Sequence, residues 1–120
     1  MPLDVEHRPA LLSCEENDLM TVFRLDSHQA IASLPQAKGG DVIAFDAGLK
    51  RIYVACYEGA ISVFQEDDPT HFRKRGDVSV QKRVHSLAIG PATHKVYAPE
   101  EQENGKPAAK IVVFDAVPVP

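Results

Sequence analysis

Short hydrophobic runs, separated by turn residues, recur along the whole chain. In the middle of the sequence, runs at 41–46, 51–56 and 60–65 are rich in Val, Ile, Tyr and Phe. The segments between them, 47–50 and 57–59, each contain a glycine, as is typical of the tight turns of β-hairpins. No stretch of a dozen residues has the 3.6-residue periodicity of a helix. The pattern therefore predicts an all-β protein built from short antiparallel strands.

The same pattern repeats with a period of roughly 40 to 45 residues. Cys14 and Cys56 lie 42 residues apart, and Tyr53 and Tyr97 lie 44 apart, each in the second strand of its unit. The dipeptide Val-Phe occurs at 22–23, 63–64 and 113–114. Repeats of this length belong to propellers or solenoids. More polar fourth runs, at 29–35 and 72–80, complete the four antiparallel strands of a propeller blade.

The repeat predicts that the whole chain forms one partial propeller of roughly 2.7 to 3 blades. We expect blade one at 1–40, lacking part of its inner strand, blade two at 41–82, and blade three at 83–120, lacking its outer strand. The prolines at 118 and 120 disfavour a further paired strand. Because propellers close at about 4 to 8 blades, this chain is not expected to close a ring alone.

Five segments carry a family resemblance. Residues 43–46, 50–55 and 59–64 read IAFD, KRIYVA and GAISVF, and in the third unit 87–97 and 111–115 read LAIGPATHKVY and IVVFD. These sequence segments resemble the blade repeats of the YVTN-type, or YncE-like, β-propellers. The resemblance covers nearly the whole chain and implies a partial propeller of about three blades, from the C-terminal part of a longer, seven-bladed protein.

The resemblance also implies how the ring is completed. Propellers of this family usually take the outer strand of the last blade from the other end of the chain, so the missing N-terminal blades of a parent protein are one expected partner. Self-association of two or three copies through the blade edges is the alternative, because an open ring exposes sheet edges and apolar faces. Family members are often exported, to the periplasm or outside the cell.

Composition and charge narrow the classes of partner. The chain is 44% hydrophobic and 25% charged, which fits a globular protein rather than a disordered one. Its net charge of -4 argues against nucleic acid or an anionic membrane as a partner. The first residues have neither a basic region nor an apolar stretch, so no signal peptide is expected on this sequence, and no apolar run is long enough to span a membrane. The sequence does not specify the cellular compartment of the protein.

The two cysteines occupy equivalent positions in neighbouring blades. Such positions should lie further apart than a disulfide tolerates. Cys14 and Cys56 are therefore interpreted as reduced, structural residues, with Glu100 at the matching position of the third unit.

Propeller topology predicts where a ligand would bind. The loops between the second and third strands, and those between blades, emerge together on one face around the central channel, and loops on a rigid scaffold commonly carry function. We expect a long third loop starting at Glu100, because the repeat offset grows there by about six residues. The candidate ligand-binding residues on this face are Tyr57, Glu58, Arg83, His85, Glu100 and Glu101.

Two interpretations of these residues are open. Arg83 or Lys82 could hold an anionic ligand, or His85 with Glu100 could hold a metal ion. The favoured interpretation is a solvated rim of charges, because the five histidines show no ligand spacing, and no metal or other cofactor is predicted. The basic run at 71–75 is interpreted as a charged edge of an outer strand. No phosphate loop or nucleophile motif is present.

Three functions fit this sequence. The favoured one is a non-catalytic propeller segment that acts as a binding or protein-interaction module. The second is a partial propeller that assembles with copies of itself to close a ring. The third is a fragment of a propeller enzyme, since propellers resembling this one include quinoprotein dehydrogenases and lactonases.

Overall fold

The computed structural model describes residues 9–14, 18–24, 29–68, 71–82, 86–90, 92–103 and 105–116. All the regular elements in these ranges are β-strands: β1 (Pro9–Cys14), β2 (Leu19–Arg24), β3 (Gln29–Pro35), β4 (Gly40–Asp46), β5 (Arg51–Cys56), β6 (Ala60–Asp68), β7 (His71–Ser79), β8 (Ala88–Ile89), β9 (Val96–Glu103) and β10 (Lys106–Phe114). This part of the chain contains no helical segment that could cross a bilayer.

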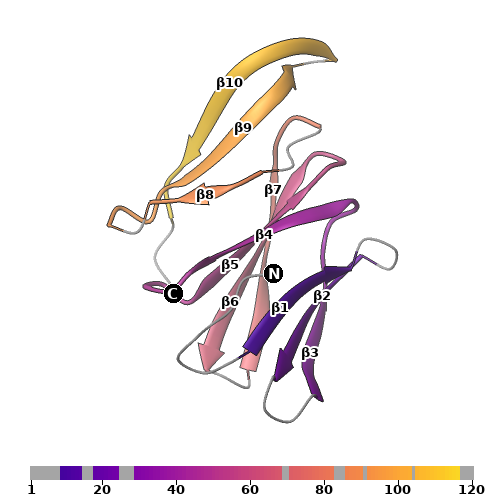
Figure 1. Ribbon diagram of the computed structural model, residues 1–120, viewed down its shortest axis with the longest axis vertical. Helices are drawn as coiled ribbons and strands as arrows, with labels where there is room; N and C mark the ends of the chain where they lie inside the picture. The colour runs from indigo at the N-terminus through magenta and orange to yellow at the C-terminus, as the bar shows by residue number, and fades with distance from the viewer. Residues whose placement is uncertain are drawn as a thin grey trace.

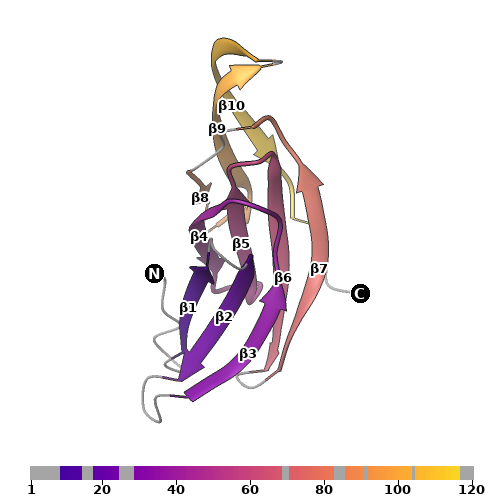
Figure 2. The same cartoon turned by 90° about the vertical axis from the view of Figure 1, so that its right-hand side faces the viewer.

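The strands form three separate antiparallel sheets. Their strand orders are β1-β2-β3, β4-β5-β6-β7 and β10-β9-β8, and we call these sheets blades one, two and three. Both views place blade two between the other blades (Figures 1 and 2). The all-β fold of propeller-like antiparallel blades is thereby confirmed. The inner strand expected near Leu3 in blade one lies outside the described residues.

Neighbouring blades contact each other through their first described strands and, between blades one and two, through their outer strands as well. β4 contacts both β1 and β8, and the outer strands β3 and β7 also touch. Neighbouring blades are therefore packed face to face, in the order in which they occur along the chain (Figure 1).

Blade two is buried on both of its faces. Along β5, all six residues are buried, and alternate side chains point to opposite faces of the sheet. On the face toward blade one, Ile52, Val54 and Cys56 cluster with Met20, Val22 and Phe64. On the face toward blade three, Tyr53, Ala55 and Ile61 cluster with Val96 and Ala98. Burial on both faces explains why β5 is a continuous hydrophobic run in the sequence.

The prediction of a long loop after the second strand of blade three is wrong. β9 continues through Glu100 and Glu101 to Glu103, and β10 begins at Lys106, so the extra residues lengthen a hairpin. Their backbone groups pair across the hairpin, with a register shift between Pro107 and Lys110. Pairing satisfies backbone donors and acceptors that a loop would leave to solvent, which favours the longer hairpin.

Candidate functional site

The turn between β5 and β6 forms the centre of the predicted ligand-binding face. The backbone N–H of Tyr57 donates to the carbonyl of Gly39 over 2.8 Å, and the N–H of Val80 donates to the carbonyl of Gly59 over 3.0 Å. These bonds join the turn at 57–59 to the loops that precede and follow blade two. We call the surface made by residues 38–39, 57–59 and 82 the loop face.

Two glycines allow the loops of this face to pack closely. Gly39 has φ of +80°, and a Cβ there would lie 3.2 Å from the Cβ of Tyr57. Gly59 has φ of +112°, and a Cβ there would lie 3.2 Å from the carbonyl oxygen of Val80 and 3.6 Å from Cγ of Lys82. A backbone with positive φ and this little space favours glycine at both positions.

The predicted site residues do not all meet on the loop face. Tyr57, 39% exposed, and the exposed Glu58 lie together on its turn. Glu100 is instead a buried residue of β9, opposite Lys110, and Glu101 is a strand residue as well. Arg83 and His85 lie outside the described residues. In the described ranges, no group of three or more His, Cys, Asp or Glu side chains could hold a metal ion.

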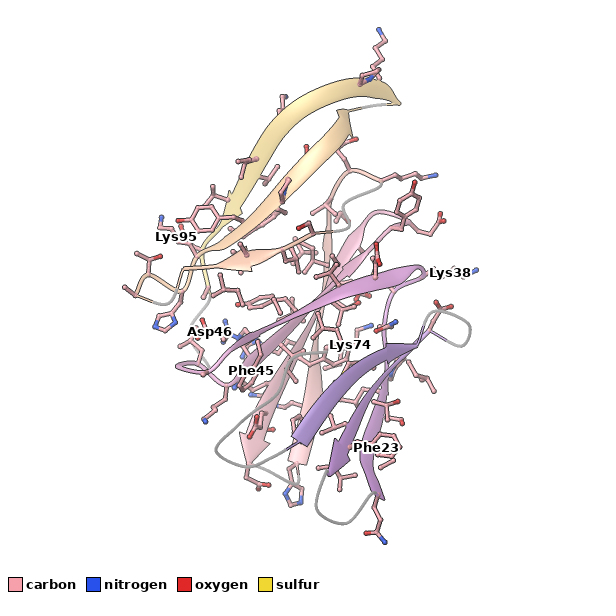
Figure 3. All side chains as sticks on the ribbon, viewed as in Figure 1. Phe23, Lys38, Phe45, Asp46, Lys74 and Lys95 are labelled. Atoms are coloured by element: carbon pink, nitrogen blue, oxygen red, sulfur yellow. The ribbon has the colours of Figure 1, made fainter. Side chains whose placement is uncertain are left out.

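The opposite side of the molecule carries a contact between blades that the sequence did not reveal. Nδ1 of His94, in the turn before β9, lies 2.7 Å from Oδ2 of Asp46 at the end of β4. Figure 3 shows Asp46 and Lys95 on one side of the molecule and Lys38 on the other. The contact therefore fixes blade three to blade two away from the loop face.

A cavity of about 450 Å³ lies between blades two and three. Arg51 and Tyr53 of β5 line it, together with Arg75 of β7. Apolar side chains from both blades complete the wall, among them Val63, Val78 and Phe114. The sequence does not reveal this cavity, because its charged residues come from β5, from β7 and from the segment that follows β10.

The basic run at 71–75 divides between two environments. His71 and Arg73 contact Asp68 and Asp67 at 2.7 and 3.0 Å on the exposed surface, as the charged-edge interpretation expects. Lys74 contacts Asp77 at 3.1 Å. Arg75 differs, because it lines the cavity. Arg75 thus contributes positive charge to the cavity between the blades.

Neither a protein-family model nor a curated protein matches the sequence. The fold is similar to two solved structures described as "putative 6-phosphogluconolactonase", from Bacteroides fragilis and Bacteroides uniformis, each with a TM-score of 0.73. The identities are 12% and 15%, and the matches cover 95% of this chain but only 38% and 40% of those chains. The chain thus spans about two fifths of their length. Together, the packed antiparallel blades of three and four strands and this likeness define a segment of a β-propeller fold.

Proposed function

We propose that the chain is a segment of a lactonase-type β-propeller enzyme and that its loop face contributes to the binding of a sugar lactone. The observation that carries this proposal is the fold likeness to two candidate 6-phosphogluconolactonases over 95% of the chain. The same likeness gives no support to the non-catalytic binding module favoured on the sequence alone. That function stays a prediction, as does membership of the YVTN-type family.

The loop face offers groups suited to a phosphorylated sugar lactone. The exposed ring of Tyr57 can pack against a sugar, and the carboxylate of Glu58 can accept hydrogen bonds from sugar hydroxyls. Lys38 and Lys82 are exposed on either side of this turn and can attract the phosphate. The binding energy would come from side chains that two positive-φ glycines hold near one another.

A titration with 6-phosphogluconate, the acid formed from the lactone, tests the loop face. We expect chemical-shift changes in the ¹⁵N NMR spectrum at Tyr57, Glu58 and Lys82, and at least tenfold weaker binding in Tyr57→Ala. Thr21→Ala, in blade one, is the control and should bind like the parent chain. Shift changes confined to residues outside the loop face, or none up to 20 mM, would contradict the proposal.

A second candidate function is assembly through the open side of blade three. Ile111 and Val113 of β10 are 66% and 48% exposed, and β10 is an end strand of its sheet. In blade one, the outer strand β3 instead packs Ile31 and Leu34 onto the core shared with blade two. Ile111 and Val113 alternate with Phe114, which packs toward blade two, so they lie on the far face of blade three, where a further blade or strand could cover them.

A further inference from the structure

The wall of the cavity between blades two and three includes the positively charged side chain of Arg51, whose hydrogen-bond partner Gln65 is neutral. Arg51 is 2% exposed, and its Nε donates to Oε1 of Gln65 over 3.3 Å. The Gln65 amide in turn donates to the carbonyls of Leu49 and Lys50 at 2.8 and 2.9 Å. The guanidinium is thereby fixed in orientation. Within the described ranges, its Nη2 atom is buried and makes no hydrogen bond. The cross-strand neighbour of Arg51 is the buried carboxylate of Asp46, whose oxygens contact Gly48, Leu49 and His94 instead. A buried cation is costly without a paired opposite charge, so this geometry favours an anion.

A second cation lines the same cavity. Arg75 reaches it from the outer strand β7. Both arginines line the one cavity, and repulsion between like charges is expected there. In keeping with this, burial lowers the pKa of Arg75, and the positive charges of Arg51 and Arg73 lower it further. An oxyanion between them would relieve this repulsion and accept hydrogen bonds from both planar groups.

The carboxylates that line the cavity are engaged elsewhere. Asp77 accepts a hydrogen bond from Ser62 over 2.6 Å and one from Lys74 over 3.1 Å. Asp115 is largely exposed and contacts Lys95 at 3.0 Å. Neither contact neutralises Arg51, so the guanidinium groups dominate the charge inside the cavity.

The remaining wall suits an organic anion better than an inorganic one. The buried Tyr53 hydroxyl lies beside the Arg51 guanidinium, and a phenol can donate its own proton to an oxyanion while it accepts from a cation. Burial raises the pKa of Tyr53, which keeps this proton in place at neutral pH. The apolar side chains of Val63, Val78 and Phe114 face the rest of the space. The volume, about 450 Å³, falls within the range of small-molecule sites.

We propose that this cavity binds a small organic anion, with its phosphate or carboxylate group between Arg51 and Arg75 and its apolar part against Val63, Val78 and Phe114. The Tyr53 hydroxyl donates a third hydrogen bond to the oxyanion. The site lies apart from the loop face and does not depend on lactonase activity.

Phenyl phosphate is the probe that tests this site, because it joins an oxyanion to an apolar ring. We expect saturable ¹⁵N chemical-shift changes at Arg51, Tyr53 and Arg75. Benzyl alcohol, which has the ring without the charge, should bind at least tenfold more weakly, and inorganic phosphate should also bind more weakly. Equal binding of phenyl phosphate and benzyl alcohol, or no change up to 20 mM phenyl phosphate, would overturn the proposal.

Matched arginine variants locate the binding. Arg51→Gln and Arg75→Gln should each weaken phenyl phosphate binding at least tenfold, whereas Arg73→Gln, whose parent side chain contacts Asp67 on the surface, should leave it unchanged. Arg75→Gln keeps the proposal testable if loss of the buried Arg51 impairs folding. An equal loss in Arg73→Gln and Arg75→Gln would show a general charge effect and contradict the assigned site.

The same anion chemistry could come from a carboxylate on a second copy of the chain. Light scattering during the phenyl phosphate titration separates the two sources. The proposal expects an unchanged native mass. Dissociation of an oligomer by phenyl phosphate would assign the cavity to a protein carboxylate and overturn the proposal of a small-molecule site.

Discussion

Asp46 of blade two and His94 of blade three form a direct contact between blades, with 2.7 Å between Oδ2 and Nδ1. The other oxygen of the same carboxylate accepts hydrogen bonds from the backbone N–H groups of Gly48 and Leu49, at 3.0 and 3.2 Å. The Asp46 side chain is only 3% exposed. One carboxylate therefore orders its own turn and positions the neighbouring blade.

Removing either side chain of this contact should destabilise the fold. An ionised carboxylate can only accept, so His94 donates from Nδ1, and hydrogen bonds to charged groups contribute about 1.5 to 3 kcal/mol. We expect Asp46→Asn and His94→Gln to lower the free energy of unfolding by about that amount in urea titrations. In the double variant, the coupling should be about 1 kcal/mol. Additive losses would show that the contact contributes nothing.

Gly48 makes room for the His94 ring. A Cβ at Gly48 would lie 2.6 Å from Cε1 of His94, closer than atoms can approach. Gly48→Ala should therefore displace the ring from Asp46 and cost about 1 to 3 kcal/mol in the free energy of unfolding. The matched test is the same substitution in a His94→Ala background, where most of this cost should disappear. A cost that persists there would place the strain in the backbone turn instead.

Cys56 should make stability depend on pH in the alkaline range. Cys56 is a free, buried cysteine, and burial raises the pKa of its thiol. The unfolded thiol loses its proton near pH 8.5 while the folded one keeps it, so the stability present below about pH 8.5 falls as pH rises. In urea titrations from pH 7.5 to 10, the free energy of unfolding should fall less steeply with pH in Cys56→Ala than in the parent chain. Tyr53→Phe is the control, and it should change the pH dependence of stability only above about pH 10. An unchanged slope in Cys56→Ala would contradict this assignment.

The open side of blade three should govern self-association. Ile111→Lys with Val113→Lys places charges on the exposed face of β10, which disfavours the addition of another strand. We expect light scattering to show an oligomer for the parent chain and a monomer for this double variant. Ala47→Lys, in the exposed turn after β4, is the control and should keep the parent mass. The same mass for the parent and the double variant would exclude assembly through this edge.

Much of the fold follows from hydrophobic periodicity. The predicted strand at 51–56 is β5 residue for residue, and the predicted outer strand at 72–80 differs from β7 by one residue at each end. β5 is predictable because both of its faces are buried, so its sequence is continuously hydrophobic. β7 is more polar and exposed, and it is predictable as the fourth run of the repeat. The longer hairpin of blade three is not predictable in this way, because the repeat offset shows that about six residues are inserted after Glu100 but not whether they pair, and they extend β9 and β10.

The candidate sites were less predictable for a physical reason. Tyr57 and Glu58 could be placed because one turn brings them together. The Asp46 contact with His94 and the cavity beside Arg51 join residues of different strands or blades, and no local spacing specifies such a meeting. A useful signal was nevertheless present in Gly48, whose lack of a side chain leaves space for the ring of the next blade.

Hydrolysis of 6-phosphogluconolactone is the measurement that tests the proposed function most directly. The rate of base consumption at constant pH would be compared with the spontaneous rate in buffer, for the parent chain, Tyr57→Ala and the control Thr21→Ala. We expect hydrolysis above the buffer rate, retained in Thr21→Ala and lost in Tyr57→Ala. A rate equal to that of buffer alone, across protein concentrations that include any oligomer detected by light scattering, would contradict it.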